Sequence, residues 1–228
     1  AIGNANVLIV RSTKVYAETI EAGKSLELII RAGAGVNNID LEKASSNGVY
    51  VANCPGKNSD AVAELTLGHI IACDRRIVDA SLDLRSGNWK KKAYQNAAGL
   101  KGRTLGIIGL GSIGSALAKL AKGLDMNVIA WSRSLTPDKA DKLDLVYCES
   151  IAEVAANADV VSVHLAVTPD TKQLLNTDFF NKMKDGAIFV NTSRGEIVNT
   201  AALHKAIDEK ALRVGLDVFE NEPGSGLA

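Results

Sequence analysis

Short apolar runs alternate along the chain with longer segments in which apolar residues recur every three or four positions. The runs predict strands at residues 6–10, 26–30, 48–52, 104–108, 128–131, 145–148, 160–164, 187–191 and 214–218. The longer segments predict helices at residues 16–22, 41–47, 113–124, 151–156, 177–183 and 200–209. Strands that alternate with helices in this way predict a doubly wound α/β fold with parallel sheets.

A turn-rich stretch at residues 53–59 interrupts this pattern and predicts a boundary between two domains. We therefore expect a second, smaller α/β domain over residues 1–55 and a larger domain over residues 56–228. Asp60 is a candidate cap for one long helix over residues 60–84, and a helix of that length would bridge the two domains.

The apolar run at residues 104–108 leads into three glycines with GxGxxG spacing, and a helical pattern follows. This order of strand, tight turn and helix is typical of a dinucleotide-binding βαβ unit. Gly109 would permit the turn, Gly111 would let backbone N–H groups approach a pyrophosphate, and Gly114 would let helix and strand pack closely. The loop therefore predicts NAD or NADP as the cofactor.

The residues after the next predicted strand bear on the choice between these cofactors. A carboxylate that binds the adenosine ribose is expected there, about 20 residues past the glycines, but the chain has Ser132 and Arg133. Asp125 precedes the strand and would lie at the opposite edge of the sheet. A hydroxyl and a guanidinium suit a 2′-phosphate, which favours NADP. Alternatively, Arg133 stacks on the adenine and NAD binds.

The composition narrows the class of protein. The 26 basic and 26 acidic residues cancel, so the overall charge gives no indication of a nucleic-acid partner. The cysteines, at 54, 73 and 148, have no metal-ligand spacing and indicate reduced thiols in a cytosolic protein. No apolar run approaches the roughly 20 residues that cross a bilayer, and no signal peptide is visible. We expect a cytoplasmic protein with no membrane partner and no metal.

Polar residues stand at three further predicted strand ends, which is where ligands bind in parallel sheets. They are His164, Arg194 and Asp217, and Glu222 follows soon after. Arg194 could fork onto a substrate carboxylate or keto oxygen, or it could form a salt bridge with Asp217.

Taken together, these segments resemble the D-2-hydroxyacid dehydrogenase family. The resemblance is carried by residues 109–114, 191–198 and 216–223, and it extends upstream to residues 10–13, 31–40, 53–59 and 62–66. It therefore covers nearly the whole chain, and residues 31–40 and 53–59 are most similar to the phosphoglycerate dehydrogenase branch. Ala166 and Ser132 depart from the pattern, because the family often has proline and aspartate there.

The resemblance implies a partial, flavodoxin-like substrate domain before a Rossmann cofactor domain. It also implies hydride transfer between NAD(P) and C2 of a D-2-hydroxy acid. As catalytic residues, Arg194 would hold and polarise the substrate, and Glu222 would pair with a histidine that the family pattern places beyond residue 228. Asp217 would orient the nicotinamide. Since the family's first βα unit also lies outside the chain, we expect these residues to bind dinucleotide better than they turn over substrate.

The resemblance also assigns binding residues, alongside those chosen above. The cofactor set is Ala34, Gly109, Gly111, Ser112, Ile113, Gly114, Ser132, Arg133, His164, Leu165, Thr192, Ser193, Arg194 and Asp217. The substrate set is Arg11, Ser12, Arg31, Gly33, Gly35 and Asn58.

The substrate and the assembly follow from the same resemblance. Arg11, Arg31 and the basic run Lys90, Lys91 and Lys92 favour a phosphorylated acid, 3-phosphoglycerate, and so a role in serine biosynthesis. The alternatives are a glyoxylate or hydroxypyruvate reductase, a nucleotide-sensing regulator on the same fold, and a module that binds cofactor without turnover. The basic run lies in a predicted loop over residues 87–101, where a solvated surface is the simpler interpretation. We expect a homodimer built by the long helix and this loop.

Overall fold

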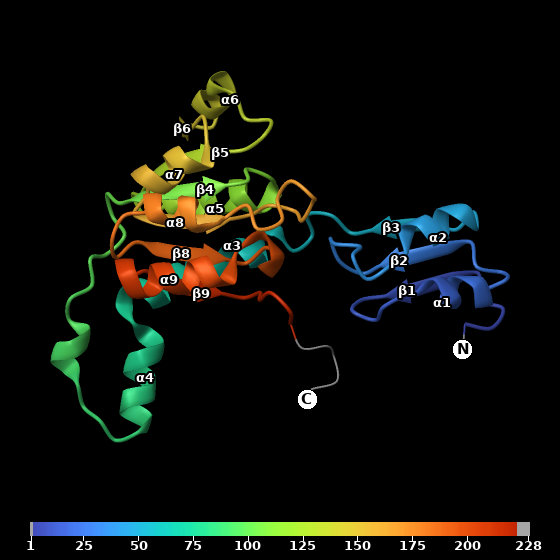
Figure 1. The fold of residues 1–228 in the computed structure, drawn as a ribbon, viewed down its shortest axis with the longest axis horizontal. Helices are drawn as coiled ribbons and strands as arrows, with labels where there is room; N and C mark the ends of the chain where they lie inside the picture. Colours follow the sequence, from blue (N-terminus) through green and yellow to red (C-terminus); the bar gives the residue numbers. More distant parts are fainter. Residues whose placement is uncertain (1, 223–228) are drawn as a thin grey trace. The chain divides into compact units, whose positions relative to one another are not determined.

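The computed structural model describes residues 2–222 of the chain (Figure 1). Its internal contacts divide the chain into two compact units, Ala1–Ser59 and Asp60–Ala228. Each unit is a parallel sheet with helical connections, as the alternation of strands and helices predicts.

The first unit is a three-stranded parallel sheet in the order β1-β2-β3. Its elements are β1 (Val7–Val10), α1 (Ala17–Ala22), β2 (Leu28–Arg31), α2 (Leu41–Ser46) and β3 (Tyr50–Asn53). Ile20 of α1, Ile29 of β2 and Ala44 of α2 are almost completely buried in one core. The start of α2 is set by Asp40, whose carboxylate accepts the Lys43 N–H at 2.9 Å and so caps the helix.

The second unit contains a six-stranded parallel sheet in the order β6-β5-β4-β7-β8-β9. The strands are β4 (Thr104–Ile108), β5 (Asn127–Trp131), β6 (Val146–Tyr147), β7 (Val160–Val163), β8 (Ile188–Asn191) and β9 (Arg213–Leu216). The chain runs outward from β4 to β6 and then returns to place β7 on the other side of β4. In open sheets of this kind, ligands bind at the carboxyl ends of the strands where the order reverses, here between β4 and β7.

Helices cover both faces of this sheet, so its strands are apolar on both sides. One face packs against α7 (Ile151–Asn157), α8 (Thr177–Lys182) and α9 (Thr200–Lys210), and the other against α3 (Ser59–Arg75), α5 (Ser112–Lys122) and α6 (Pro137–Lys142). Neighbouring residues alternate between the faces: Ile107 packs with the second group of helices and Ile108 with the first. The continuous apolar runs in the sequence are therefore strands buried on both faces.

The prediction of one long helix over residues 60–84 is wrong. The helix begins at Ser59, which makes Asp60 a first-turn acid rather than the cap, and α3 ends at Arg75. Arg76 has left-handed backbone angles (φ 51°, ψ 44°), which a continuous α-helix cannot accommodate, and α4 (Ile77–Arg85) starts afresh after it. The Arg76 side chain donates to Asp79 at 3.0 Å and lies over the ring of Tyr94, 4.9 Å from its centre.

The segment from α4 to Tyr94 projects away from the sheet of the second unit (Figure 1). Predicted as a loop, residues 87–101 contain a short 3-10 helix at Lys91–Tyr94. Lys90 is not simply solvated, because its ammonium group donates to the Asp83 carboxylate at 2.9 Å. We call the segment 77–94 the arm.

All the predicted strands are present, but the bounds of most of them differ from the prediction by one or two residues. β9 ends at Leu216 rather than at residue 218, so Asp217 lies just past the strand, and β6 is only two residues long. Over the part of the chain that the structure describes, no helix is both long and apolar enough to cross a membrane.

Candidate functional site

The glycine loop joins β4 to α5 at the point where the strand order reverses. Gly109 has a φ of +100°, and a Cβ there would lie 2.5 Å from the carbonyl oxygen of His164. A Cβ on Gly114 would collide with the Gly109 carbonyl oxygen, so the first turn of α5 packs directly on the loop. A Cβ on Gly111 would meet no atom of the described residues within 4 Å. Gly109 and Gly114 are thus needed for packing, whereas Gly111 faces open space.

The N-terminus of α5 faces the same open space. Gly111 precedes the helix and supplies no side-chain cap, so Ser112 and Ile113 present backbone N–H groups that no side chain within residues 2–222 satisfies. The first turn of a helix carries partial positive charge and favours an anion. An uncapped helix beside a glycine without steric neighbours is an arrangement that suits the pyrophosphate of a dinucleotide.

His164 follows β7 and is anchored beside the glycine loop. Its backbone N–H donates to the Ile108 carbonyl at 2.8 Å, and the Nε2 atom of its ring lies 2.9 Å from the Ser162 hydroxyl. Nδ1 is buried and has no hydrogen-bond partner among the described residues. Burial lowers the pKa of His164 to about 4, so the imidazole is neutral at physiological pH. Leu165, the next residue, packs its side chain against Gly109.

The loop after β8 is held together by Asn191. Its carboxamide oxygen accepts the Ser193 N–H at 3.0 Å, and its amide group donates to the Arg194 carbonyl at 2.9 Å. The Thr192 hydroxyl lies 2.8 Å from that of Thr66 on α3, and both are buried. These bonds fix the backbone from which Arg194 projects.

Arg194 forms no salt bridge with Asp217 or with any other carboxylate among the described residues. Its Nη1 donates to the Ser193 carbonyl at 2.6 Å, and its side chain is half-buried. The interpretation of Arg194 as a structural partner of Asp217 is therefore wrong, and most of the guanidinium donors are left for another acceptor.

Asp217 and Glu222 lie on the loop after β9, next to the Arg194 loop. The Asp217 N–H donates to the Asn191 carbonyl at 3.1 Å. A Cβ on Gly195 would collide with the Phe219 backbone, so the two loops are in direct contact. Glu222 is exposed, and its carboxylate accepts the Phe219 N–H at 3.0 Å. The histidine that the family pattern pairs with Glu222 lies outside the described residues.

The end of β5 carries a basic cavity. Ser132 is half-buried and Arg133 is exposed. A cavity of about 330 Å³ is lined by Leu110, Ser132, Ser134, Leu135, Lys139, Lys142 and Leu143, so its lining includes two lysines and no acidic residue. The Lys139 ammonium donates to the Ser134 carbonyl at 2.9 Å. Asp125 lies before β5 and pairs with Lys101 at 2.9 Å instead.

The predicted substrate residues and Ala34 all belong to the first unit, and the other predicted residues belong to the second. Arg11, Ser12 and Asn58 are exposed, Gly33 and Gly35 are half-buried, and the Ala34 carbonyl accepts the Asn53 side-chain amide at 2.7 Å. Arg31 ends β2, where it pairs in register with Val10 and Asn53. Its guanidinium folds over Gly33, where a Cβ would collide with it, and its Nε is buried without a partner among the described residues.

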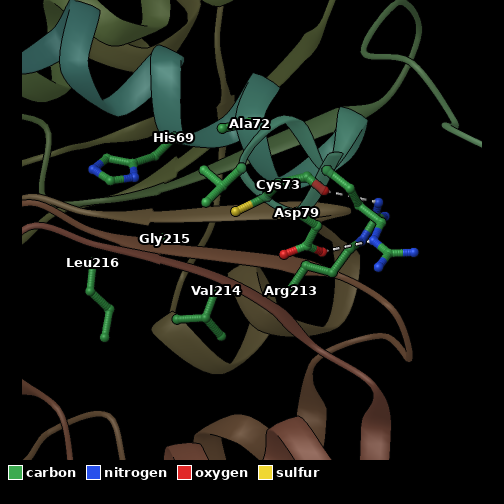
Figure 2. A pocket seen from close by; sticks show the side chains of 10 residues that line it. His69, Ala72, Cys73, Asp79, Arg213, Val214, Gly215 and Leu216 are labelled. Atoms are coloured by element: carbon green, nitrogen blue, oxygen red, sulfur yellow. Dashed lines mark hydrogen bonds and ion pairs between the residues drawn. The ribbon is translucent and has the colours of Figure 1, made fainter. Parts of the chain in front are cut away.

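A second cavity, of about 470 Å³, lies beside α3, α4 and β9 and contains none of the predicted site residues (Figure 2). Its lining includes His69 and Cys73 of α3 and Arg213 and Gly215 of β9, and the His69 side chain packs directly on Gly215. Burial is the main cause of the raised pKa of the Cys73 thiol, so this thiol is not activated for nucleophilic attack. Within residues 2–222 no three His, Cys, Asp or Glu side chains are grouped to hold a metal ion.

The sequence interpretation missed two buried hydroxyls at the candidate site. Ser162 is fully buried within β7 and contacts His164, and Thr66 contacts Thr192 from α3. A buried hydroxyl needs a hydrogen-bond partner. The lone serine in the apolar run Val160–Val163 therefore indicates, from the sequence, a buried hydroxyl with a nearby hydrogen-bond partner.

Residues 67–226, well over half of the chain, match the model of the D-isomer specific 2-hydroxyacid dehydrogenase NAD binding domain. The chain belongs to this family. The glycine loop and the strand-end loops that carry His164, Arg194 and Asp217 all lie within the matched NAD binding domain.

Relatives that are named for different substrates also match the chain over nearly its whole length, which supports the assignment to the D-2-hydroxyacid dehydrogenase family. The chain is 42% identical over 228 residues to a hydroxypyruvate reductase of Thermotoga maritima, a match that covers 97% of this chain and 72% of that protein. It is 40% identical over 224 residues to a D-3-phosphoglycerate dehydrogenase of Methanocaldococcus jannaschii, covering 97% of this chain but only 43% of the relative. The solved glyoxylate reductase of Paecilomyes thermophila superposes with a TM-score of 0.84 at 32% identity, over 96% of this chain and 68% of that one.

Proposed function

We propose that the protein transfers a hydride between a nicotinamide cofactor and C2 of a D-2-hydroxy acid. The observation that carries this proposal is the set of groups at the carboxyl ends of four neighbouring strands: the open glycine loop after β4, His164 after β7, Arg194 after β8 and Asp217 after β9. A dinucleotide lies across these ends in folds of this kind.

Each group has a role that follows from its chemistry. The bound nicotinamide supplies or accepts the hydride. The uncapped first turn of α5 binds the pyrophosphate, and Asp217 orients the nicotinamide. Arg194, whose donors no carboxylate engages among the described residues, binds the substrate carboxylate and polarises the 2-oxygen. Glu222 acts through the histidine partner that the family pattern assigns to it.

The substrate we propose is 3-phosphoglycerate in one direction and 3-phosphohydroxypyruvate in the other, a reaction of serine biosynthesis. Arg11 and Arg31 support it, because both lie at the carboxyl edge of the three-stranded sheet and both suit a phosphate. Reduction of hydroxypyruvate or glyoxylate is the second candidate, supported by the names of two of the relatives above.

Steady-state assays with the three keto acids distinguish these candidates. We expect the highest kcat/KM for 3-phosphohydroxypyruvate, and we expect Arg31→Ala to lower it while leaving the kcat/KM for glyoxylate within a few-fold, because glyoxylate has no phosphate. Arg194→Ala should lower kcat/KM for all three. An Arg31→Ala variant with unchanged selectivity would favour the simpler reductase.

For the cofactor, we infer that NADPH binds at least as well as NADH. The support is the pair Ser132 and Arg133 in place of a carboxylate, next to a cavity that contains Lys139 and Lys142. Fluorescence titration with both cofactors tests this, with Lys139→Ala expected to weaken NADPH and spare NADH. Binding of NADH more than tenfold tighter than NADPH, about 1.4 kcal/mol, would contradict the inference.

For the assembly, we propose a homodimer in which the arm forms the contact. Val78, Leu82 and Leu84 of α4 and Trp89 after it are 61%, 57%, 59% and 77% exposed. Large apolar side chains gathered on one projecting segment favour a protein interface. Lys91 or Lys92 of the arm would then reach the substrate pocket of the neighbouring subunit.

A further inference from the structure

The carboxylate of Glu220 joins three loops of the second unit. Its Oε2 accepts a hydrogen bond from the Thr200 hydroxyl at 2.8 Å, and its Oε1 accepts one from the side-chain amide of Gln173 at 3.2 Å. Thr200 is the first residue of α9, and Gln173 lies in the loop between β7 and α8. Both carboxylate oxygens are therefore engaged by residues from other loops. We call Glu220, Thr200 and Gln173 the clamp.

Gln173 is held at this junction in an unusual backbone conformation. Its φ is +50°, in the left-handed region, where a residue with a side chain persists only when the surrounding contacts hold it. Its backbone N–H donates to the Glu196 carbonyl at 2.8 Å, and its side-chain carbonyl accepts the Asn199 amide at 3.4 Å. Gln173 thus bonds to the loop after β8 as well as to the loop after β9.

The backbone on either side of the clamp brings the same two loops together. A Cβ on Gly195 would collide with the backbone of Phe219 and Glu220, so the loops touch without intervening side chains. Phe219 is 57% exposed and does not anchor its loop in the core. Within the described residues, Glu220 makes the only side-chain hydrogen bonds from residues 217–222 to another loop. The position of residues 217–222 therefore depends on this one carboxylate.

The clamp lies between the side chains to which the proposed function gives roles. Asp217 and Glu222 stand on either side of Glu220 in its loop, and Arg194 directly precedes Gly195 in the other. A shift of about 1 Å in such a group can lower a reaction rate by as much as about 100-fold. A contact that fixes one of these loops against the other therefore bears on turnover.

We propose that Glu220 is a positioning residue: through the clamp it fixes residues 217–222 against the loop that carries Arg194. The proposal rests on the proposed function, in which the side chains of both loops meet the nicotinamide and the substrate. It gives Glu220 no contact with either ligand, so its effect comes from its hydrogen bonds and not from its charge.

Three variants separate these two effects. Glu220→Ala removes both hydrogen bonds of the carboxylate. Glu220→Gln removes the charge but can keep both bonds, because its carbonyl can accept the Gln173 amide while its own amide donates to the Thr200 hydroxyl. Glu196→Ala is the matched control, because Glu196 is an exposed glutamate of the neighbouring loop whose side chain lies outside the clamp.

Steady-state assays use whichever of the three keto acids is reduced fastest. We expect Glu220→Ala to lower kcat roughly tenfold and to leave the NADH dissociation constant nearly unchanged, because the pyrophosphate binds at the glycine loop. Glu220→Gln should restore most of the wild-type kcat, and Glu196→Ala should leave it unchanged.

Amide hydrogen exchange provides a readout that needs no activity. The Phe219 N–H, which donates to the Glu222 carboxylate at 3.0 Å, should exchange faster in Glu220→Ala, since the loop opens more often once the clamp is lost. It should exchange at the wild-type rate in Glu220→Gln and in Glu196→Ala.

The proposal is overturned if Glu220→Ala keeps either the wild-type kcat or the wild-type exchange of Phe219, or if Glu220→Gln is as slow as Glu220→Ala. The last result would mean that the charge matters and the contacts do not. A wild-type protein that reduces none of the keto acids would contradict the proposed dehydrogenase function. Faster exchange of Phe219 in Glu220→Ala would in that case still support the hold of the clamp on its loop.

Discussion

At the scale of single residues, the three glycines of the loop have separable roles. Gly109 is needed for its φ of +100° and for contact with the His164 carbonyl, whereas Gly111 faces open space at an ordinary φ of −88°. A substitution at Gly111 should therefore affect ligand binding without affecting the packing of the fold.

We therefore expect Gly109→Ala and Gly111→Ala to differ. Gly109→Ala should lower the free energy of unfolding by about 1–3 kcal/mol, because it combines backbone strain with a collision. Gly111→Ala should leave the melting temperature near that of the wild type but weaken NADH at least tenfold, since its methyl group would occupy the space for the pyrophosphate. Thermal denaturation and fluorescence titration measure the two effects. A Gly111→Ala variant that binds NADH normally would mean that the pyrophosphate lies elsewhere.

The partly buried His164 predicts a pH dependence of stability. Its folded pKa of about 4 lies below the value of 6.5 that is usual for histidine. Between these two values the unfolded chain binds a proton at residue 164 that the folded chain does not, so stability falls as the pH is lowered from about 6.5 to about 4. The loss attributable to this residue is at most about 3 kcal/mol.

His164→Gln should flatten this part of the profile, measured by denaturant unfolding from pH 4 to 7. His204→Gln is the control, because His204 is exposed on α9 and its removal should leave the profile unchanged. If the wild-type and His164→Gln profiles are parallel over this range, the imidazole is solvated and the argument from burial fails.

At the scale of elements, one carboxylate near the end of α3 ties this helix to the sheet. The Asp74 side chain is 1% exposed and lies 3.1 Å from the Arg103 guanidinium just before β4 and 3.7 Å from that of Arg213 at the start of β9. It also accepts the Gly99 N–H at 3.0 Å. A helix that lies across the sheet is thus linked to two of its strands by a buried charge.

Asp74→Ala should destabilise the protein by about 3–5 kcal/mol, because it leaves partly buried guanidinium groups without a carboxylate. Glu209→Ala removes an exposed partner of Lys205, 3.8 Å away, where both side chains are 58% exposed, and should cost less than about 0.5 kcal/mol. Urea unfolding of both variants measures the difference. If both variants lose little free energy of unfolding, water hydrates the Arg103 and Arg213 guanidinium groups once the Asp74 carboxylate is removed.

At the scale of the whole molecule, the arm exposes large apolar side chains that a monomer would leave in contact with water. Its ends are held internally: Tyr94 bonds to Asp83, Lys90 pairs with Asp83, and Arg76 lies over the Tyr94 ring. The arm is therefore ordered by its own contacts while its apolar side chains remain exposed, which favours a protein interface. We propose that the partner in this interface is a second copy of the chain.

The double variant Val78→Asp, Leu82→Asp should convert the dimer to a monomer, because two carboxylates would then be buried without partners in the interface. Light scattering at micromolar concentration gives the mass. Leu143→Asp is the control, since Leu143 is 50% exposed but lies just past α6, outside the arm. A monomeric wild-type protein would contradict the proposed dimer.

The sequence by itself determined the features that depend on local periodicity and on glycine sterics. Apolar runs buried on both faces and helices with regular apolar spacing are visible within a short window, so the two parallel α/β units and the glycine loop could be predicted. Parallel strands place their carboxyl ends at one edge, so the order of elements also predicted that His164, Arg194 and Asp217 would share it.

Tertiary structure alone decided which side chains find partners. Helical spacing continues through Arg76, but its side chain is held by Asp79 and Tyr94, and the backbone turns left-handed there. The spacing of Arg194 and Asp217 allows a salt bridge, yet the Asn191 carboxamide holds the Arg194 loop in another geometry. A hydrogen bond requires atoms within about 3 Å, and such distances depend on strand register and loop path. These arise from packing between segments far apart in sequence, so no local window contains them.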